Sequence, residues 1–352
     1  MIRTLIAGLL LGFVTTLSGT AMAAEKAVEF RFSHFLPAKY ILFQKGSEGS
    51  YADWMKSITE ASGGTITFKV FPTGQLGGGK DHYNLAAKGV ADIAFVNPGY
   101  TPGRFPVIAL GEIPLTFKDA ISGSAALWDW YRDLASAEMP DVKVLNSFIS
   151  PAGTIHSNRP VKQPNDLKGM KVRPGNATVA RFVSSLGGTN VQVPIMDSRD
   201  ALARGLVDAT TMGFSSLMTF RQNKLVKYHL NLPLYSITFV TAMNKKSYDR
   251  LSARQKKVMA DHGTPQWSQK IIAAWAQKET KGLSDMMADG NEHHLHQPAG
   301  ANLTAWKNAT APLNAAWRKS VSKKTSLNPD NLVKNFRASL DKYHAGQNVG
   351  AP

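Results

Sequence analysis

The order of the first periodic segments constrains the fold of this chain most strongly. Residues 28–32 alternate apolar and polar side chains, which predicts a strand, and residues 48–61 follow with a helical pattern. A glycine pair ends that helix, and residues 65–71 predict a second strand. A β-α-β order is typical of a parallel sheet whose faces are covered by helices. We therefore expect an α/β fold.

A helix-glycine-strand unit occurs twice, far apart in the chain. Residues 87–92 read AKGVAD and residues 203–208 read ARGLVD. In each copy a basic residue and a glycine end a helix, as a left-handed C-cap requires, and a short apolar strand follows at 93–96 or 209–212. The repetition predicts two lobes that are built on a similar plan.

The β-α-β order also returns in the second half of the chain. Residues 170–173 predict a strand, 176–186 a helix and 191–193 the next strand. After a leader is removed, about 330 residues fit two lobes. We expect the first lobe at 24–148, the second at 149–236, and a return to the first lobe with the C-terminal helices at 237–352.

A long helical pattern starts at a capping box, Ser252 to Gln255, and continues to Gly290. A single helix of this length would be longer than one lobe, so we expect it to pack across both. The alternative is a break or kink at residues 263–265, which read GTP. The overall expectation from these patterns is two α/β lobes with a long helix packed across both.

The N-terminus has the layout of a secretory signal. Arg3 precedes an apolar run, and Ala21-Met22-Ala23 resembles a cleavage site. The alternative is a membrane anchor, but polar residues interrupt the apolar run well before the roughly 20 residues that a span needs. We expect residues 1–23 to be a signal peptide and the protein to be exported to the periplasm.

The composition excludes several classes of function. The chain has no cysteine, so disulfides, cysteine-ligated metals and thiol nucleophiles are excluded. The net charge of +16 favours anions in general, but the basic residues are scattered and do not predict nucleic-acid binding. No nucleophile-elbow or zinc-protease motif occurs, so neither an enzyme nor a cofactor is expected.

Two further motifs have ordinary explanations. Residues 74–80 match the G-x4-G-K pattern of a phosphate loop, but Asp81 stands where magnesium coordination needs Ser or Thr, so we expect a turn. Residues 292–296 read EHHLH and could present imidazoles to a metal. No nearby residue completes a ligand set, and we expect a solvated strand edge without a metal site.

The predicted strand ends supply the candidate ligand-binding residues, because open α/β sheets bind ligands at the carboxyl ends of their strands. Arg173 ends one strand, and its guanidinium can hold a carboxylate with two hydrogen bonds. A surface or interlobe salt bridge is the alternative role for Arg173. The other candidates follow the remaining strands and are mixed polar and aromatic: His34, Phe35, Asn97, Tyr100, Met212 and Phe214.

These features together resemble the solute-binding proteins of TRAP transporters, the DctP-like family, over most of the chain. The segments that carry the resemblance are 32–35 (FSHF), 71–77 (FPTGQLG), 89–92 (GVAD), 166–173 (DLKGMKVR) and 205–208 (GLVD). The resemblance implies a two-lobed α/β fold of the periplasmic-binding-protein type, with a ligand cleft between the lobes. It also implies that Arg173 pairs with the carboxylate of a small organic acid, that the lobes close on it, and that a membrane permease is the partner. We expect a monomer.

The chain differs from sugar-acid and dicarboxylate binders of this family at two places. Residues 153–157 read GTIHS where many of them have a further arginine, which makes His156 the candidate polar contact there. Met212 stands where they commonly have asparagine. An apolar or aromatic monocarboxylate is therefore the expected ligand. An exported hydrolase and a charge-driven polyanion-binding surface protein are the alternatives.

Overall fold

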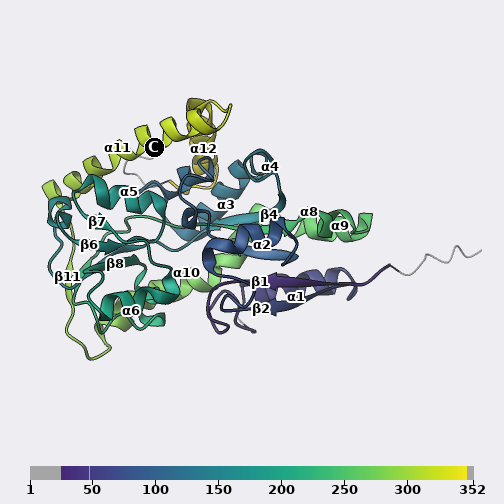
Figure 1. Ribbon diagram of the computed structural model, residues 1–352, viewed down its shortest axis with the longest axis horizontal. Helices are drawn as coiled ribbons and strands as arrows, with labels where there is room; N and C mark the ends of the chain where they lie inside the picture. The colour runs from purple at the N-terminus through teal and green to yellow at the C-terminus, as the bar shows by residue number, and fades with distance from the viewer. Residues whose placement is uncertain (1–24, 47, 347–352) are drawn as a thin grey trace, which may run out of the picture.

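The computed structural model describes residues 25–46 and 48–346 (Figure 1), and the predicted signal peptide lies outside them. The described residues form two sheets, and helices flank each of them (Figure 1). The two sheets form the cores of two lobes, which confirms the expected α/β class. Within this part of the chain, no helix is long and apolar enough to cross a membrane.

The first sheet has the strand order β2-β1-β3-β10-β4. Its strands are β1 (Val28–Ser33), β2 (Ile66–Phe71), β3 (Ile93–Val96), β4 (Val142–Ile149) and β10 (Thr238–Asn244). Strand β1 is parallel to β2 and β3, whereas β10 is antiparallel to β3 and β4. Phe30 and Phe32 are fully buried on one face of β1, in agreement with the predicted alternation.

The second sheet has the strand order β11-β9-β5-β8-β6-β7. Its strands are β5 (Thr154–Ser157), β6 (Lys171–Arg173), β7 (Thr189–Asn190), β8 (Ala209–Met212), β9 (Tyr228–Leu230) and β11 (His294–His296). Strand β7 ends before the strand expected at 191–193 begins. Strand β11 pairs with β9, so the segment after residue 237 contributes to both sheets and does not return to the first alone.

The helices of the first half are α1 (Tyr51–Ala61), α2 (His82–Ala87), α3 (Ala120–Tyr131), α4 (Ala135–Glu138) and α5 (Ala177–Ser185). Those of the second half are α6 (Ser198–Ala203), α7 (Phe214–Thr219), α8 (Lys245–Asp249), α9 (Ala253–Asp261), α10 (Pro265–Met287), α11 (Gly300–Lys324) and α12 (Pro329–Lys342). Both glycines of the repeated helix-glycine-strand unit have the positive φ that a left-handed C-cap requires, +72° at Gly89 and +68° at Gly205.

The long helix predicted from residue 252 to residue 290 is two helices, α9 and α10. The break lies at 263–265, where Thr264 caps α10 and Pro265 is its first residue. Helix α10 still has 23 residues, which is about 34 Å. It packs against α3 and β4 of the first lobe and against α7 of the second, so the expected packing across both lobes is confirmed.

Helix α11 also contacts both lobes, which the sequence did not predict. The indole N–H of Trp306 donates to the carbonyl oxygen of Lys162, beside the second sheet, at 3.2 Å. The indole N–H of Trp317 donates to the carbonyl oxygen of Pro106, beside the first sheet, at 2.7 Å. Both rings are buried, so α11 is fixed to each lobe by an aromatic anchor.

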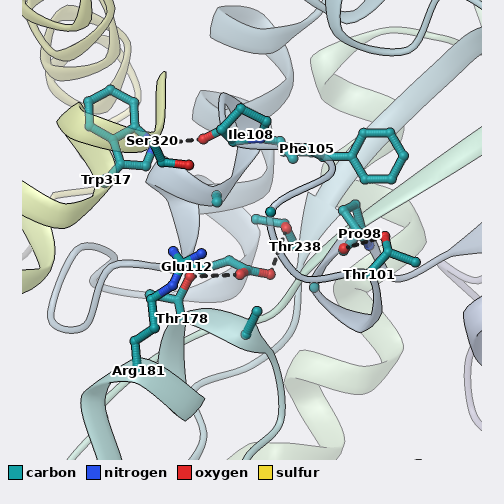
Figure 2. A pocket seen from close by; sticks show the side chains of 15 residues that line it. Pro98, Thr101, Phe105, Ile108, Glu112, Thr178, Arg181, Thr238, Trp317 and Ser320 are labelled. Atoms are coloured by element: carbon teal, nitrogen blue, oxygen red, sulfur yellow. Dashed lines mark hydrogen bonds between the residues drawn. The ribbon is translucent and has the colours of Figure 1, made fainter. Parts of the chain in front are cut away.

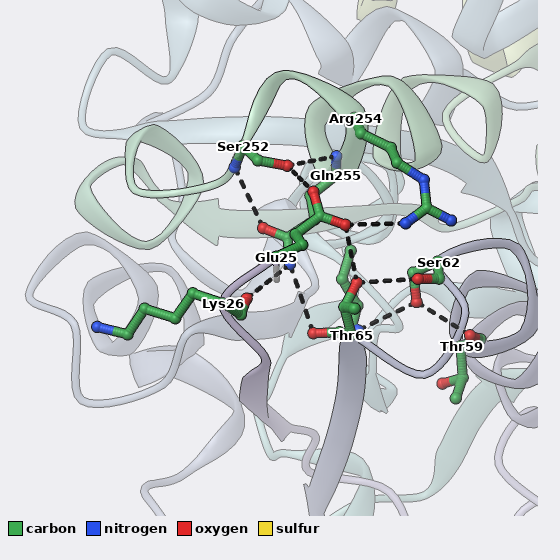
Figure 3. A network of polar contacts seen from close by, with 9 residues as sticks. Glu25, Lys26, Thr59, Ser62, Thr65, Ser252, Arg254 and Gln255 are labelled. Atoms are coloured by element: carbon green, nitrogen blue, oxygen red, sulfur yellow. Dashed lines mark hydrogen bonds and ion pairs between the residues drawn. The ribbon is translucent and has the colours of Figure 1, made fainter. Parts of the chain in front are cut away.

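Glu25 holds the start of the described chain against the N-terminus of α9 (Figure 3). Its carboxylate accepts hydrogen bonds from the hydroxyls of Ser252 and Thr65 and pairs with Arg254 at 3.0 Å. The hydrogen bond from Ser252 is the main cause that lowers the pKa of Glu25. Since Ser252 is also the N-cap of α9, one carboxylate joins the residues before β1, the start of β2 and the helix.

The close approach of α10 to α7 gives a stability prediction at Gly282. A Cβ on this residue would lie 2.5 Å from the backbone nitrogen of Ser215. Alanine normally favours a helix relative to glycine. We nevertheless expect Gly282→Ala to reduce the free energy of unfolding by about 1–3 kcal/mol, because the added methyl overpacks a backbone contact.

Thermal unfolding of Gly282→Ala beside Lys281→Ala, an exposed position of the same helix, checks this prediction. The lysine variant should unfold within a degree or so of the unsubstituted protein. Equal melting temperatures for both variants would show that α10 and α7 can separate slightly at no cost.

Candidate ligand-binding site

A cavity of about 520 Å³, part of it open to solvent, lies between the lobes at the carboxyl ends of strands from both sheets. Segments that connect the lobes complete its wall. The lining residues are Phe35, Leu36, Tyr40, Asn97, Tyr100, Ser150, Pro151, Gly153, Arg173, Ile195, Thr211, Met212, Gly213, Ser216, Phe220, Tyr235, Ile237, Phe239 and Trp275. The position agrees with the rule that strand ends form ligand sites in open α/β sheets.

Arg173 is the last residue of β6, and its side chain is buried in the cavity wall with 2% of its surface exposed. Its Nε donates to the carbonyl oxygen of Val193 at 2.9 Å, and Nη1 donates to that of Thr211 at 3.4 Å. A guanidinium has five N–H donors, so three remain after these two bonds. Among the described residues, Arg173 forms no ion pair.

Tyr235 lies beside Arg173 on the segment that leads from the second sheet to the first. Its hydroxyl donates to Thr211 Oγ1 at 2.9 Å, and burial raises its pKa to about 12. A Cβ would lie 2.7 Å from the tyrosine ring at Gly153 and 2.4 Å from its hydroxyl oxygen at Gly175. The ring therefore fits between two backbone segments that only glycine leaves wide enough.

Aromatic rings form much of the remaining wall. The Phe35 ring lies 5.5 Å from that of Tyr100, and the Tyr40 ring lies 5.4 Å edge-on from that of Trp275. Phe239 packs 6.1 Å from Trp275. These centroid distances are typical of favourable aromatic pairs, so the wall is preformed and apolar.

Polar groups on this wall are few. Asn97 Oδ1 accepts a hydrogen bond from the backbone N–H of Gly99 at 3.0 Å, which leaves the side-chain NH2 without a partner among the described residues. The hydroxyl of Tyr100, from the first lobe, accepts from the backbone N–H of Ile195 in the second lobe at 3.4 Å. Tyr100 therefore contributes both to the wall and to the contact between the lobes.

Five of the eight residues predicted from the sequence line this cavity: Phe35, Asn97, Tyr100, Arg173 and Met212. His34, His156 and Phe214 do not, and their expected place is corrected. His34 points to the opposite side of the chain from Phe35 and stacks on Phe43 with ring centroids 3.5 Å apart. Burial lowers the pKa of His34 to about 3.

His156 and Phe214 lie behind the wall rather than on it. His156 Nε2 contacts the backbone oxygen of Met212 at 3.1 Å, and the Phe214 ring lies 5.0 Å edge-on from the imidazole. Phe214 begins α7 after β8 has ended, so the strand alternation that places Met212 no longer fixes its direction.

The sequence reasoning missed the aromatic residues that other segments bring to the cavity: Tyr40, Phe220, Tyr235, Phe239 and Trp275. A signal existed for two of them. Tyr235 and Phe239 lie on either side of the boundary at 236–237, where the chain was expected to return from the second lobe to the first. Trp275 lies on the helix expected to cross both lobes, but the helical pattern alone does not show which turn faces the cleft.

The family of the chain follows from comparison with known proteins. The model for the bacterial extracellular solute-binding proteins of family 7, DctP, matches residues 32–322. The chain belongs to this family. Its members are the solute-binding proteins of TRAP transporters, which bind small molecules for transport and work with a membrane permease.

Solved structures of family members superpose closely on this chain. A TRAP solute-binding protein from Rhodoferax ferrireducens with copurified benzoate has a TM-score of 0.83 at 28% identity, and the match covers 90% of this chain and 99% of that one. A marine metagenome protein specific for aromatic acid ligands, with 3-hydroxybenzoate, has a TM-score of 0.82 at 28% identity with the same coverage.

A relative with a different ligand is more distant in sequence. The C4-dicarboxylate-binding periplasmic protein DctP of Rhodobacter capsulatus is 21% identical over 341 residues, which is 92% of this chain and 97% of the relative. The family therefore includes proteins for both aromatic monocarboxylates and dicarboxylates, and family membership alone leaves the ligand of this chain open.

A second cavity of about 400 Å³ lies next to the contact between the lobes and contains the buried carboxyl group of Glu112 (Figure 2). This group accepts hydrogen bonds from Thr238 in the first lobe at 3.0 Å and from Thr178 on α5 in the second lobe at 3.1 Å. Burial raises the pKa of Glu112 to about 7. The group therefore joins the lobes and titrates near neutral pH.

Glu112 gives a pH prediction. Because its pKa is raised from 4.5 to about 7 in the folded protein, the folded state holds the proton more tightly than the unfolded chain. The contribution of Glu112 to the free energy of unfolding therefore falls as the pH rises from 4.5 to about 7. We expect Glu112→Gln, which stays neutral, to gain melting temperature relative to the unsubstituted protein across this range.

Melting temperatures at half-unit pH steps measure this difference. Glu29→Gln, at an exposed position, is the control and should track the unsubstituted protein at every pH. A difference between Glu112→Gln and the unsubstituted protein that stays constant from pH 4.5 to 8 would contradict the assignment.

Proposed function

We propose that this protein is the exported solute-binding component of a TRAP transporter that captures a small aromatic monocarboxylate. The ligand carboxylate pairs with Arg173, the lobes close over the ring, and the monomeric complex delivers the ligand to the membrane permease. The observation that carries this proposal is a buried guanidinium with three unused donors, opposite an aromatic wall.

The electrostatic argument concerns Arg173. Removing a cation from water is unfavourable unless an anion or several hydrogen bonds compensate it. Hydrogen bonds to two backbone carbonyls compensate part of this cost. The N–H groups that remain, on Nη2 and Nη1, lie in one plane and can make two parallel hydrogen bonds to a carboxylate. The side-chain NH2 of Asn97, on the same cavity, is an additional donor for a ligand oxygen.

The charge of the wall favours one carboxylate over two. Arg173 is the one charged residue among the described residues that line the cavity. A second carboxylate would be buried against Phe35, Phe239 and Trp275 without a cation, which is unfavourable. A ring in the same place would instead contribute about 25 cal/mol per Å² of buried apolar surface.

The comparisons support the same ligand class. The benzoate-bound and the 3-hydroxybenzoate-bound relatives, both at 28% identity, hold an aromatic ring and one carboxylate. The dicarboxylate-binding relative is only 21% identical. Periplasmic location in that relative, together with the signal-like sequence of residues 1–23, supports export. Membership of a family of transport proteins disfavours the hydrolase and the polyanion-binding alternatives.

Replacement of Arg173 tests the proposal. We expect Arg173→Gln to weaken the binding of benzoate and 3-hydroxybenzoate by about 2–5 kcal/mol, which is about 30-fold or more in Kd. The ligand-free variant should melt no lower than the unsubstituted protein, because it no longer buries an uncompensated charge.

Calorimetric titration with benzoate, 3-hydroxybenzoate and succinate, and melting curves without ligand, give both results. Arg204→Ala removes an exposed cation of the second lobe and should leave the Kd unchanged. Succinate should bind the unsubstituted protein much more weakly than benzoate. A ligand-free Arg173→Gln protein that melts several degrees lower but keeps its affinity would assign Arg173 a structural role and reject the proposal.

A further inference from the structure

Three histidines form a continuous hydrogen-bonded chain behind the cavity wall. His156 Nε2 contacts the Met212 carbonyl oxygen at 3.1 Å, and its Nδ1 lies 2.8 Å from Nδ1 of His229. His229 Nε2 lies 3.0 Å from Nδ1 of His293, whose Nε2 lies 3.1 Å from Oδ1 of Asp289. The three imidazoles are almost completely buried.

The hydrogen-bonded chain of histidines crosses the second sheet from its middle to its edge. The Met212 carbonyl belongs to β8, His156 to β5 and His229 to β9, and these strands are neighbours in the sheet. His293 directly precedes the edge strand β11. Asp289 follows the end of α10, the helix that crosses both lobes. The chain thus joins the cavity wall to the end of that helix.

The protons of this chain can be counted. A carbonyl oxygen ends it on one side and a carboxylate on the other, and both groups only accept hydrogen bonds. Four hydrogen bonds need four protons on nitrogen, whereas three neutral imidazoles supply three. The chain therefore holds one more proton than its neutral rings, provided that Asp289 is ionised.

The environment of Asp289 keeps it ionised. Burial alone would raise its pKa, but hydrogen bonds from Asn223, Asn291 and His293 together lower the pKa well below the ordinary value. Burial lowers the pKa of His156 to about 4 and that of His229 to about 2, so these two rings are neutral at pH 7. The additional proton then belongs on His293, beside the carboxylate.

The directions of the hydrogen bonds follow from this count. His156 carries its proton on Nε2 and donates to Met212, so its Nδ1 must accept. His229 carries its proton on Nδ1 and donates to His156, so its Nε2 accepts from Nδ1 of His293. His293 donates at both nitrogens. The reverse direction is excluded because the Met212 carbonyl oxygen has no proton to donate.

We propose that His156, His229 and His293 are positioning residues for the cavity: their chain holds one additional proton against Asp289 and, through His156, fixes the Met212 carbonyl at the end of β8. The same backbone segment supplies Met212 and Gly213 to the cavity wall. The role in ligand binding rests on the proposed function, whereas the proton count does not.

Other charged side chains lie near the three histidines but are not part of their hydrogen-bonded chain. The Glu279 carboxylate, from α10, accepts hydrogen bonds from the backbone N–H groups of Phe214 and Ser215. At the sheet edge, the exposed Glu292 pairs with Lys227 and His294. None of these groups is hydrogen-bonded to the three chain imidazoles within the described residues.

The geometry also distinguishes the chain from a metal site. Successive imidazoles face each other nitrogen to nitrogen at hydrogen-bond distances and do not converge on a common point. Within the described residues, no group of three or more His, Asp or Glu side chains could hold a metal ion. The histidine-rich segment 292–296 thus contributes one of its members to a proton chain.

Nitrogen-15 NMR of the histidine rings at pH 7 tests the proton count directly in the unsubstituted protein, with single His→Gln variants for assignment. We expect His156 as the Nε2–H tautomer, His229 as the Nδ1–H tautomer and His293 protonated at both nitrogens. A neutral His293, or His229 as the Nε2–H tautomer, would overturn the proposal.

Asp289→Asn separates the charge from the hydrogen bonds. The asparagine side chain is neutral, so a protonated His293 would be buried without a compensating anion, which favours the neutral ring. We expect this variant to keep the tautomers of His156 and His229 and to lose one of the two protons of His293. Glu292→Gln, an exposed carboxylate three positions away, should leave all three rings unchanged.

His229→Gln interrupts the hydrogen bonds between the three histidines and tests the positioning role. We expect the backbone amide signals of Met212 and Gly213 to shift, and benzoate affinity to fall about five-fold or more, with Arg173 intact. His294→Gln, on the exposed sheet edge, should change neither.

Unchanged amide signals and affinity in His229→Gln would reject the positioning role. If the unsubstituted protein binds none of the aromatic acids, the proposed function fails on its own, while the tautomers and the amide signals still decide whether the chain positions Met212.

Discussion

The burial of the Arg173 guanidinium is the interaction on which the arrangement of the site depends. The short strand β6 places this side chain at the point where the two lobes meet, and carbonyl groups of Val193 and Thr211 hold it there. A cation in this position needs a compensating anion, and the remaining lining residues are neutral. The same constraint supports both parts of the proposed function, a carboxylate as ligand and a single carboxylate as sufficient.

The lobes are held together by contacts of two kinds, which differ in how easily they break. Glu112 and Tyr100 make single hydrogen bonds between the lobes, to Thr178 and Ile195, and such bonds can be exchanged for water at little cost. Helices α10 and α11 instead bury large side chains against each lobe. The lobe opening that the proposed function requires would therefore bend the connecting segments while these two helices keep their anchors.

The sequence predicted the elements of the site better than the directions of its side chains. Strands β3 and β8 begin and end at the predicted residues, because an apolar run between a glycine cap and a polar loop has few alternatives. Period-two alternation gives the direction of Met212, but it ends with the strand, so Phe214 was misplaced. Trp275 could not be predicted, because its position depends on how α10 packs between the lobes.

The end of β8 contributes backbone acceptors to two separate polar networks. The Thr211 carbonyl accepts from Arg173, and the Met212 carbonyl accepts from His156. These consecutive groups face opposite sides of the chain, as strand geometry requires. The cation proposed to bind the ligand and the imidazole chain proposed to support the wall therefore contact two consecutive peptide groups, one each. A shift of β8 large enough to lose one contact would also disturb the other, so the wall and the anchor should move as one unit.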